Sequence, residues 1–156
     1  MRKYEFTGET KIINLCGKEV TLHRIKAVIE FGLIKVGEVG GWIEKESNLS
    51  HDDKSWVYGN AKVWGNAKVY GNAKVSRVDH ILVIGPAGSR NDFTTFYRDK
   101  DNEITVKCGC FLGKIDKFLE KVTQTHKDNK YAIVYRASAE LAKLQIDLSE
   151  ESEENE

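Results

Sequence analysis

Hydrophobic and polar positions between residues 57 and 75 repeat with a period of six, in the string VYGNAKVWGNAKVYGNAKV. Each unit opens with a valine and has an alanine four positions later, with a Gly-Asn pair between them. This period is not that of a helix face, because about 3.6 residues per turn does not divide into six. A flat strand does not fit either, because Gly-Asn would interrupt every pass. The pattern therefore predicts a β-solenoid, in which short strands alternate with corners and each unit buries its apolar side against its neighbours.

The spacing extends beyond the three near-identical units. Ile43 lies six residues before Leu49, and Ile81 lies six residues after Val75. Leu49 and Val57 are eight residues apart, which places a two-residue insertion in the loop around 51–54. The predicted inward-facing positions are Ile43, Leu49, Val57, Val63, Val69, Val75 and Ile81.

The repeat resembles the hexapeptide repeat of left-handed β-helix proteins, in which an aliphatic residue opens each unit and a small residue follows four positions later. The resemblance implies three units per triangular turn, with Val75 returning to the wall of Val57. Seven strands then make little more than two turns, so we expect the flanking segments to cap the coil. Proteins of this kind are commonly trimeric, so the resemblance also implies a homotrimer.

A longer stretch, GGWIEKESNLSHDDKSWVYGNAKV (40–63), is similar to the entry segment of YdcK-like bacterial and phage hexapeptide-repeat proteins. This resemblance covers about residues 20–76. The strings GSRNDFTTFY and VKCGCF, further along the chain, resemble segments of phage and prophage accessory proteins. The transferase label given to such proteins comes mainly from the repeat, so it implies little about activity.

The flanking segments predict two further units. Strands are expected at 10–15 and 19–25, joined by a hairpin turn, and a helical turn at 26–32. A buried strand is expected at 78–85, a loop at 85–92, strands at 92–99 and 103–111, and helices at 114–126 and 129–146, the second capped by Asp128. The predicted fold is mainly β, with an N-terminal β cap (1–40), a short left-handed β-helix (41–84), a C-terminal α+β module (85–147) and a disordered acidic tail (148–156).

Composition narrows the setting of the protein. The chain has 156 residues, is 40% hydrophobic and 31% charged, and has a formal net charge of zero. The last ten residues hold six acids, so the preceding part carries 24 basic against 18 acidic residues. No apolar run is long enough to cross a bilayer and no secretion signal is recognised, so we expect no membrane partner. With three cysteines, a reducing compartment is expected, which is the cytoplasm, or the host cytoplasm for a phage-encoded protein.

An aromatic residue follows each of three inward valines: Tyr58, Trp64 and Tyr70. These side chains point outward, so either other segments of this chain cover them or they form a subunit interface. Lysines also recur with the repeat, at 62, 68 and 74, and lysines beside aromatic residues can bind single-stranded nucleic acid. Because consecutive units lie on different walls, these lysines do not form one stripe, and nucleic acid is not an expected partner.

The loop GPAGSR (85–90) and the strand after it are the preferred candidate site. Backbone N–H groups in a glycine-containing loop can form a concavity that binds anions, and a guanidinium can hold phosphate or carboxylate through two hydrogen bonds. Aromatic residues at 93, 96 and 97 could stack on a base. The predicted ligand-binding residues are Gly88, Ser89, Arg90, Thr94, Thr95 and Tyr97. An ordinary turn with a surface arginine is the alternative.

Two other kinds of chemistry have candidate residues in this chain. Hexapeptide-repeat acyltransferases use a histidine base, and His51 or His80 would fill that role here, although neither lies within the repeats. Cys108 and Cys110 have C-x-C spacing, which lacks the second pair of a structural zinc site, and His126 is a distant partner for a nucleophilic cysteine. No metal, cofactor or established catalytic residue is predicted.

The sequence thus predicts a non-enzymatic oligomeric binding protein of phage or prophage type. It would capture a small anionic, nucleotide-like ligand, such as a host defence signal. Acyl transfer is the first alternative, and a structural or protein-interaction role through the outward aromatic residues is the second.

Overall fold

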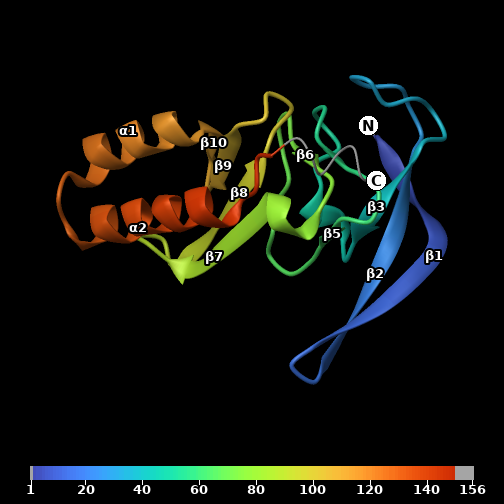
Figure 1. Cartoon of the computed structure of the whole chain (residues 1–156), viewed down its shortest axis with the longest axis horizontal. Coiled ribbons are helices and arrows are strands. Elements are labelled where there is room, and N and C mark those ends of the chain that lie inside the picture. Colours follow the sequence, from blue (N-terminus) through green and yellow to red (C-terminus); the bar gives the residue numbers. More distant parts are fainter. Residues whose placement is uncertain (1, 150–156) are drawn as a thin grey trace.

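The structure is a computed structural model that describes residues 2–149. It is mainly β, with several sheets, none of which closes on itself, and two helices. Figure 1 shows a long N-terminal hairpin at one end of the molecule, a region of short strands in the middle and the helices at the other end. The predicted acidic tail falls largely on residues 150–156, which lie outside the described residues.

The N-terminal hairpin consists of β1 (Tyr4–Leu15) and β2 (Lys18–Ala27), which pair antiparallel with a register shift between Phe6 and Thr10. It projects from the body of the molecule (Figure 1). The two predicted strands are confirmed: β1 begins earlier than predicted and ends at the predicted residue, and β2 is longer at both ends. The helical turn predicted at 26–32 is wrong. Residues 26–27 complete β2, and Phe31 and Ile34 then form an isolated antiparallel bridge within a bend.

The repeat region, residues 39–75, forms a solenoid coil in the middle of the molecule, held together by short parallel pairings. The strand β3 (Val39–Ile43) pairs with β5 (Lys62–Val63), and β4 (Trp56–Val57) pairs with β6 (Lys74–Val75). An isolated parallel bridge joins Leu49 to Val69. The partners are therefore units three apart in the sequence, at a separation of 18 residues, or of 20 where the two-residue insertion intervenes. The six predicted positions from Ile43 to Val75 are all at most 1% exposed.

Small residues and glycines form the corners of the coil. Ala61, Ala67 and Ala73 are each at most 3% exposed, as expected for a position with no room for a larger side chain. The glycine of each Gly-Asn pair has positive φ: +54° at Gly59, +67° at Gly65 and +72° at Gly71. Glycine, which lacks Cβ, adopts this left-handed backbone conformation at lower energy than other residues.

Hydrogen bonds tie the inserted loop to the coil. The Asp53 carboxylate accepts from the backbone N–H of Gly71, with an N–O distance of 2.6 Å. Lys3 is 1% exposed, and its Nζ donates to the Ser55 carbonyl oxygen over 2.6 Å. Burial lowers the pKa of Lys3 to about 8, against the opposing attraction of the Asp53 carboxylate. The insertion is therefore an ordered part of the coil.

The C-terminal part is an antiparallel sheet covered by two helices. The sheet order is β10 (Phe111–Lys114), β9 (Ile104–Cys108), β8 (Asp92–Arg98) and β7 (Ile81–Ala87). The helices α1 (Ile115–His126) and α2 (Lys130–Gln145) form the antiparallel pair visible in Figure 1. The strand β7 starts within the range assigned to the coil, and residues 78–80 form a 3-10 turn where a strand was expected.

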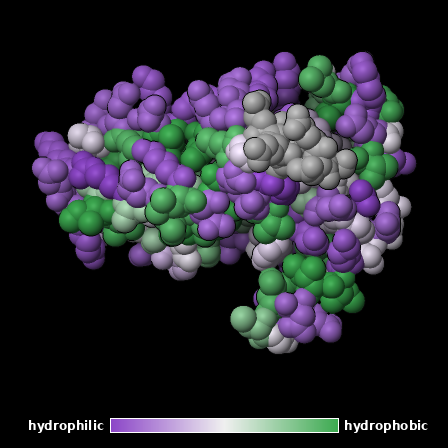
Figure 2. Space-filling view, viewed as in Figure 1, coloured by the Kyte–Doolittle hydropathy of each residue, from purple (hydrophilic) through white to green (hydrophobic). Residues whose placement is uncertain are grey.

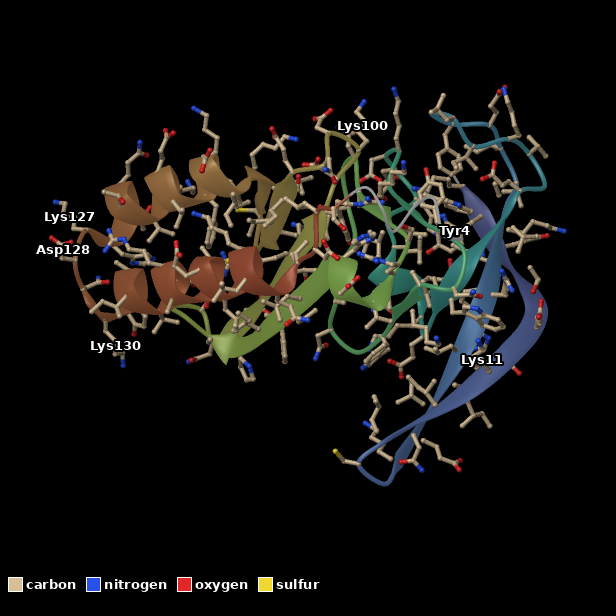
Figure 3. The ribbon with its side chains drawn as sticks, in the orientation of Figure 1. Tyr4, Lys11, Lys100, Lys127, Asp128 and Lys130 are labelled. Atoms are coloured by element: carbon tan, nitrogen blue, oxygen red, sulfur yellow. The ribbon has the colours of Figure 1, made fainter. Side chains whose placement is uncertain are left out.

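The predicted helices are confirmed to within about one residue at each end. The predicted cap of the second helix is wrong. Asn129 is the N-cap, and its side-chain oxygen accepts from the backbone N–H of Ala132 over 3.1 Å. Asp128 lies one position earlier, 98% exposed at its side chain, at the outer end of the helical pair (Figure 3).

The two faces of β8 join the two halves of the molecule. Phe96 belongs to the core beneath the helices, together with Phe118 and Tyr135. Tyr97, its neighbour in the strand, belongs to the core of the coil. Side chains alternate across a strand, so a single strand supplies residues to both cores.

Candidate functional site

A pocket of about 300 Å³ lies in the C-terminal part, where the ends of the sheet meet the two helices. The loop between β7 and β8, the turn between β9 and β10, α1 and α2 all contribute to its wall. The lining residues are Ser89, Arg90, Cys108, Cys110, Phe111, Phe118, Lys121, Val122, Thr125, His126 and Tyr135. In Figure 2, hydrophobic residues are visible between hydrophilic ones over the helical pair. The pocket lies toward the outer end of this pair, which Lys127, Asp128 and Lys130 mark in Figure 3.

Aromatic rings form the floor of this pocket. Phe118 is central: its ring centroid lies 5.7 Å from those of both Phe111 and Tyr135. The Tyr135 contact is edge-to-face, with an interplanar angle of 86°. Val122, one turn further along α1, is 4% exposed and extends the same apolar surface. Such a floor favours an apolar or planar ligand group, because burying either removes hydrophobic surface from water.

Cationic side chains stand around the rim. Arg90 and Lys121 line the pocket, and neither makes an ion pair or hydrogen bond with another residue of the described range 2–149. His126 adds a third nitrogen-bearing side chain. No aspartate or glutamate is among the lining residues in that range. Two unpaired cations beside an apolar floor make a site that attracts an anion carrying an apolar group.

Hydrogen bonds to Tyr135 hold the 88–90 loop against the helices. The Ser89 backbone N–H donates to the Tyr135 hydroxyl oxygen over 3.1 Å, and Ser89 Oγ lies 3.4 Å from His126 Nε2. Gly88, at φ +78°, packs directly against Tyr135, and a Cβ added there would overlap its hydroxyl group. Glycine is required at this position both by the backbone conformation and by the close approach.

The two cysteines of the pocket lie at the hairpin between β9 and β10: Cys108 ends β9 and Cys110 lies in the turn. Gly109, at φ +58°, separates them, and a Cβ built on it would lie 3.0 Å from Arg90 Nη1. The Arg90 guanidinium therefore lies over the turn. Cys108 is half-buried, and its sulfur accepts a hydrogen bond from Thr94 Oγ1 over 3.3 Å, whereas Cys110 is exposed.

The structure divides the predicted ligand-binding residues into two groups. Ser89 and Arg90 line the pocket, Gly88 supports the loop, and Thr94 contacts Cys108. Thr95 and Tyr97, on the opposite face of β8, point toward the coil. Thr95 Oγ1 accepts from the Lys68 N–H over 3.0 Å, and Tyr97, which is fully buried, donates to the Tyr70 carbonyl oxygen over 2.6 Å.

Several pocket residues were not predicted from the sequence. Lys121 and Thr125 lie on the polar side of α1, where lysine and threonine are ordinary surface residues. Phe111, Phe118 and Tyr135 read as core residues, and they also pack in the core beneath the sheet. No sequence signal marks them as pocket residues, because they line the pocket only once the helices have packed against the sheet.

The two histidines proposed as alternative catalytic bases are both engaged within the fold. His51 Nδ1 accepts from the Lys3 backbone N–H over 3.0 Å, so Nε2 carries the proton and donates to the Glu46 carboxylate over 2.9 Å. Its ring stacks on Tyr4 with centroids 4.0 Å apart. Both ring nitrogens are therefore occupied, and the hydrogen bond from His51 lowers the pKa of Glu46.

His80 is fully buried beneath the junction of the coil and the sheet. Its Nδ1 accepts from the Ser76 backbone N–H over 3.1 Å, and its Nε2 has no hydrogen-bond partner within residues 2–149. Burial, together with the nearby charges of Arg98 and Arg77, lowers the pKa of His80 to about 4. The ring is neutral at pH 7 and has no contact with solvent.

The outward aromatic residues of the coil are each half-buried against this chain. Tyr58 packs on the core of the coil, and Trp64 packs on a small cluster of Val20, Leu22 and Trp42. The Tyr70 ring lies 5.3 Å from Lys107 Nζ. The chain's own segments thus cover part of each ring.

Within residues 2–149, no group of three or more His, Cys, Asp or Glu side chains is placed to hold a metal ion. The helices of that same region are too short or too polar to cross a membrane.

The fold and the pocket together describe a mainly β protein with a small cationic site in its C-terminal part. No protein-family model matches the sequence. A stretch of 62 residues is 32% identical to the "Uncharacterized acetyltransferase YdcK" of Escherichia coli (strain K12). The match covers 37% of this chain and 19% of that relative, so the chain corresponds to only a small part of its length.

Proposed function

We propose that this protein binds a small amphipathic anion in the pocket between the C-terminal sheet and its helices. The observation that carries this proposal is the presence of two unpaired cations, Arg90 and Lys121, beside an aromatic floor with no acidic lining residue among those described. The guanidinium would hold the anionic group through paired hydrogen bonds. The apolar part of the ligand would lie against Phe111, Phe118 and Tyr135.

A nucleotide-like ligand fits this arrangement, because it joins a planar base to a phosphate. Aromatic side chains stack on bases without regard to sequence. In a phage, a protein with this property would sequester a host defence signal. That role rests on the resemblance of the C-terminal strings to phage accessory proteins, and the capture of the anion stands without it.

Adenosine monophosphate is a suitable probe, with adenosine and inorganic phosphate as its uncharged and base-free counterparts. Calorimetric titration is expected to show AMP binding more tightly than either counterpart. Arg90→Gln and Lys121→Gln each remove one charge from the rim and are expected to weaken AMP binding by about tenfold, the contribution of one charge-assisted hydrogen bond.

Lys117→Gln provides a matched control, because Lys117 lies one turn earlier on α1 and is 72% exposed outside the pocket. It is expected to leave AMP affinity unchanged. If Lys117→Gln and Lys121→Gln weaken AMP binding equally, the loss of affinity reflects overall charge, which would contradict the proposed site. If AMP does not bind and native mass spectrometry of the purified protein finds no retained anion, the proposal is wrong.

Acetyl transfer is a second candidate, favoured by the name of the bacterial relative. His51 or His80 would be the base, but the first has both nitrogens engaged and the second is fully buried. Turnover of acetyl-coenzyme A that is lost in His51→Ala would support this candidate. Turnover lost instead in Arg90→Gln would assign it to the C-terminal pocket.

We make two further proposals, on the handedness of the coil and on the number of subunits. Parallel pairing of units three apart supports a β-helix of three units per turn, and we propose that it is left-handed, as in the proteins that the repeat resembles. We also propose a homotrimer in which Tyr58, Trp64 and Tyr70 use their exposed edges as contacts. The subunit number follows directly from native mass spectrometry, and a monomer at micromolar concentration would exclude the trimer.

A further inference from the structure

Two of the three cysteines of the chain lie on the wall of one pocket, separated by a single glycine. Cys108 ends β9, Phe111 opens β10, and these two residues are paired across the sheet. Gly109 and Cys110 therefore form a two-residue hairpin turn, with Gly109 at φ +58°. Both thiols are free.

The turn places the two thiols within reach of one another. A disulfide requires the Cα atoms to be about 4.4–6.8 Å apart with both Cβ atoms on one side. Residues separated by one position in a tight turn fall within this range, because two successive Cα–Cα steps of about 3.8 Å are bent back at the corner. Both side chains contribute to the same pocket wall, so they face the same space.

We propose that Cys108 and Cys110 form a reversible dithiol–disulfide site whose oxidant is a low-molecular-weight disulfide such as oxidised glutathione. The exposed Cys110 thiolate attacks one sulfur of the oxidant, releasing one glutathione thiol and leaving a mixed disulfide. The Cys108 thiolate then attacks Cys110 Sγ, releasing the second glutathione. Two protein thiols are oxidised, one glutathione disulfide is reduced to two thiols, and the two protons appear on the departing glutathiones.

The surroundings of the turn support this order of attack. Cys110 is exposed, whereas Cys108 is half-buried and accepts a hydrogen bond from Thr94. The guanidinium of Arg90 lies over Gly109, between the two cysteines, where it can attract the carboxylates of glutathione. The new bond would lie on the wall of the anion pocket and make the shape of that wall depend on the redox state.

The test uses the full chain carrying Cys16→Ser, which removes the exposed cysteine of the N-terminal hairpin and prevents unrelated cross-links. After incubation with oxidised glutathione, both remaining thiols are expected to be lost. The mass should fall by two hydrogen atoms without added glutathione, and a thiol reductant should reverse the change. Peptide mapping should locate the bond within the fragment that contains Cys108 and Cys110.

Adding Cys110→Ser to this background is expected to leave one thiol that forms at most a mixed disulfide. The proposal is overturned if the Cys16→Ser protein keeps both thiols, or if it retains glutathione on them while its circular dichroism spectrum shows an intact fold. These readouts require no bound ligand. Failure of the disulfide and failure of anion binding are therefore separate results.

Discussion

Gly41→Ala is expected to lower the free energy of unfolding by at least about 3 kcal/mol, the upper range for forcing extra volume into a packed core. Gly41 lies in β3, against the turn of the coil that follows. A Cβ added there would stand 2.7 Å from the Ala61 carbonyl oxygen and 2.8 Å from Val57 Cγ1. Neither atom belongs to a flexible side-chain end, so the coil would have to move. Urea denaturation followed by tryptophan fluorescence measures the loss.

Gly65→Ala separates steric overlap from backbone strain. Gly65 has φ +67° but no atom within 4 Å of an added Cβ, so its substitution should cost only about 1 kcal/mol, the penalty of a left-handed conformation. A Gly41→Ala variant as stable as Gly65→Ala would show that β3 does not pack this closely against the coil.

Acidification is expected to destabilise the protein through His80 well before its carboxylates titrate. Burial lowers the pKa of His80 to about 4 from an ordinary value of 6.5, so the unfolded chain binds more protons between these values. The contribution of neutral, buried His80 to the free energy of unfolding is present above pH 6.5 and is lost as the pH falls toward 4. The expected loss is about 2 kcal/mol between about pH 7.5 and pH 5, and about 3 kcal/mol by pH 4.

Urea denaturation at several pH values, on the wild type and on His80→Asn, tests this assignment. The asparagine Oδ1 can still accept from the Ser76 N–H but cannot be protonated in this range. The variant should be less stable at neutral pH, yet its stability should change much less between pH 7.5 and pH 5. An equal decline in both proteins would assign the acid sensitivity to other groups.

Much of the fold could be predicted because its repeat is local and regular. The six-residue spacing placed the inward residues and accounted for the 20-residue separation of Ile43 from Val63, since it located the two-residue insertion. The 3.6-residue period placed both helices. The helix cap was misassigned because two neighbouring residues, Asp128 and Asn129, are both able to cap a helix.

The candidate site was predictable only in pieces. The sequence marked Arg90, the two cysteines and His126 for separate reasons. They lie in one pocket only because Thr94 pairs with Cys108 and the helices pack on the sheet, which brings distant parts of the chain together. The two-residue alternation of a strand places Thr94 and Thr95 on opposite faces, so the sequence alone indicates that these two threonines do not face one ligand.

Both ends of the coil are covered by other segments of this chain, which limits how two copies can pair through their sheet edges. At one end, the antiparallel strand β2 occupies the outer edge of β3. At the other, residues of β8 and the turn after it bond backbone groups of the last units: Thr95 to Lys68, Tyr97 to Tyr70, Arg98 to Lys74 and Lys100 to Asn72. Beyond β2, the edge of that sheet is β1, which is interrupted by its register shift and carries charged residues. End-on stacking of coils through backbone pairing is thereby disfavoured.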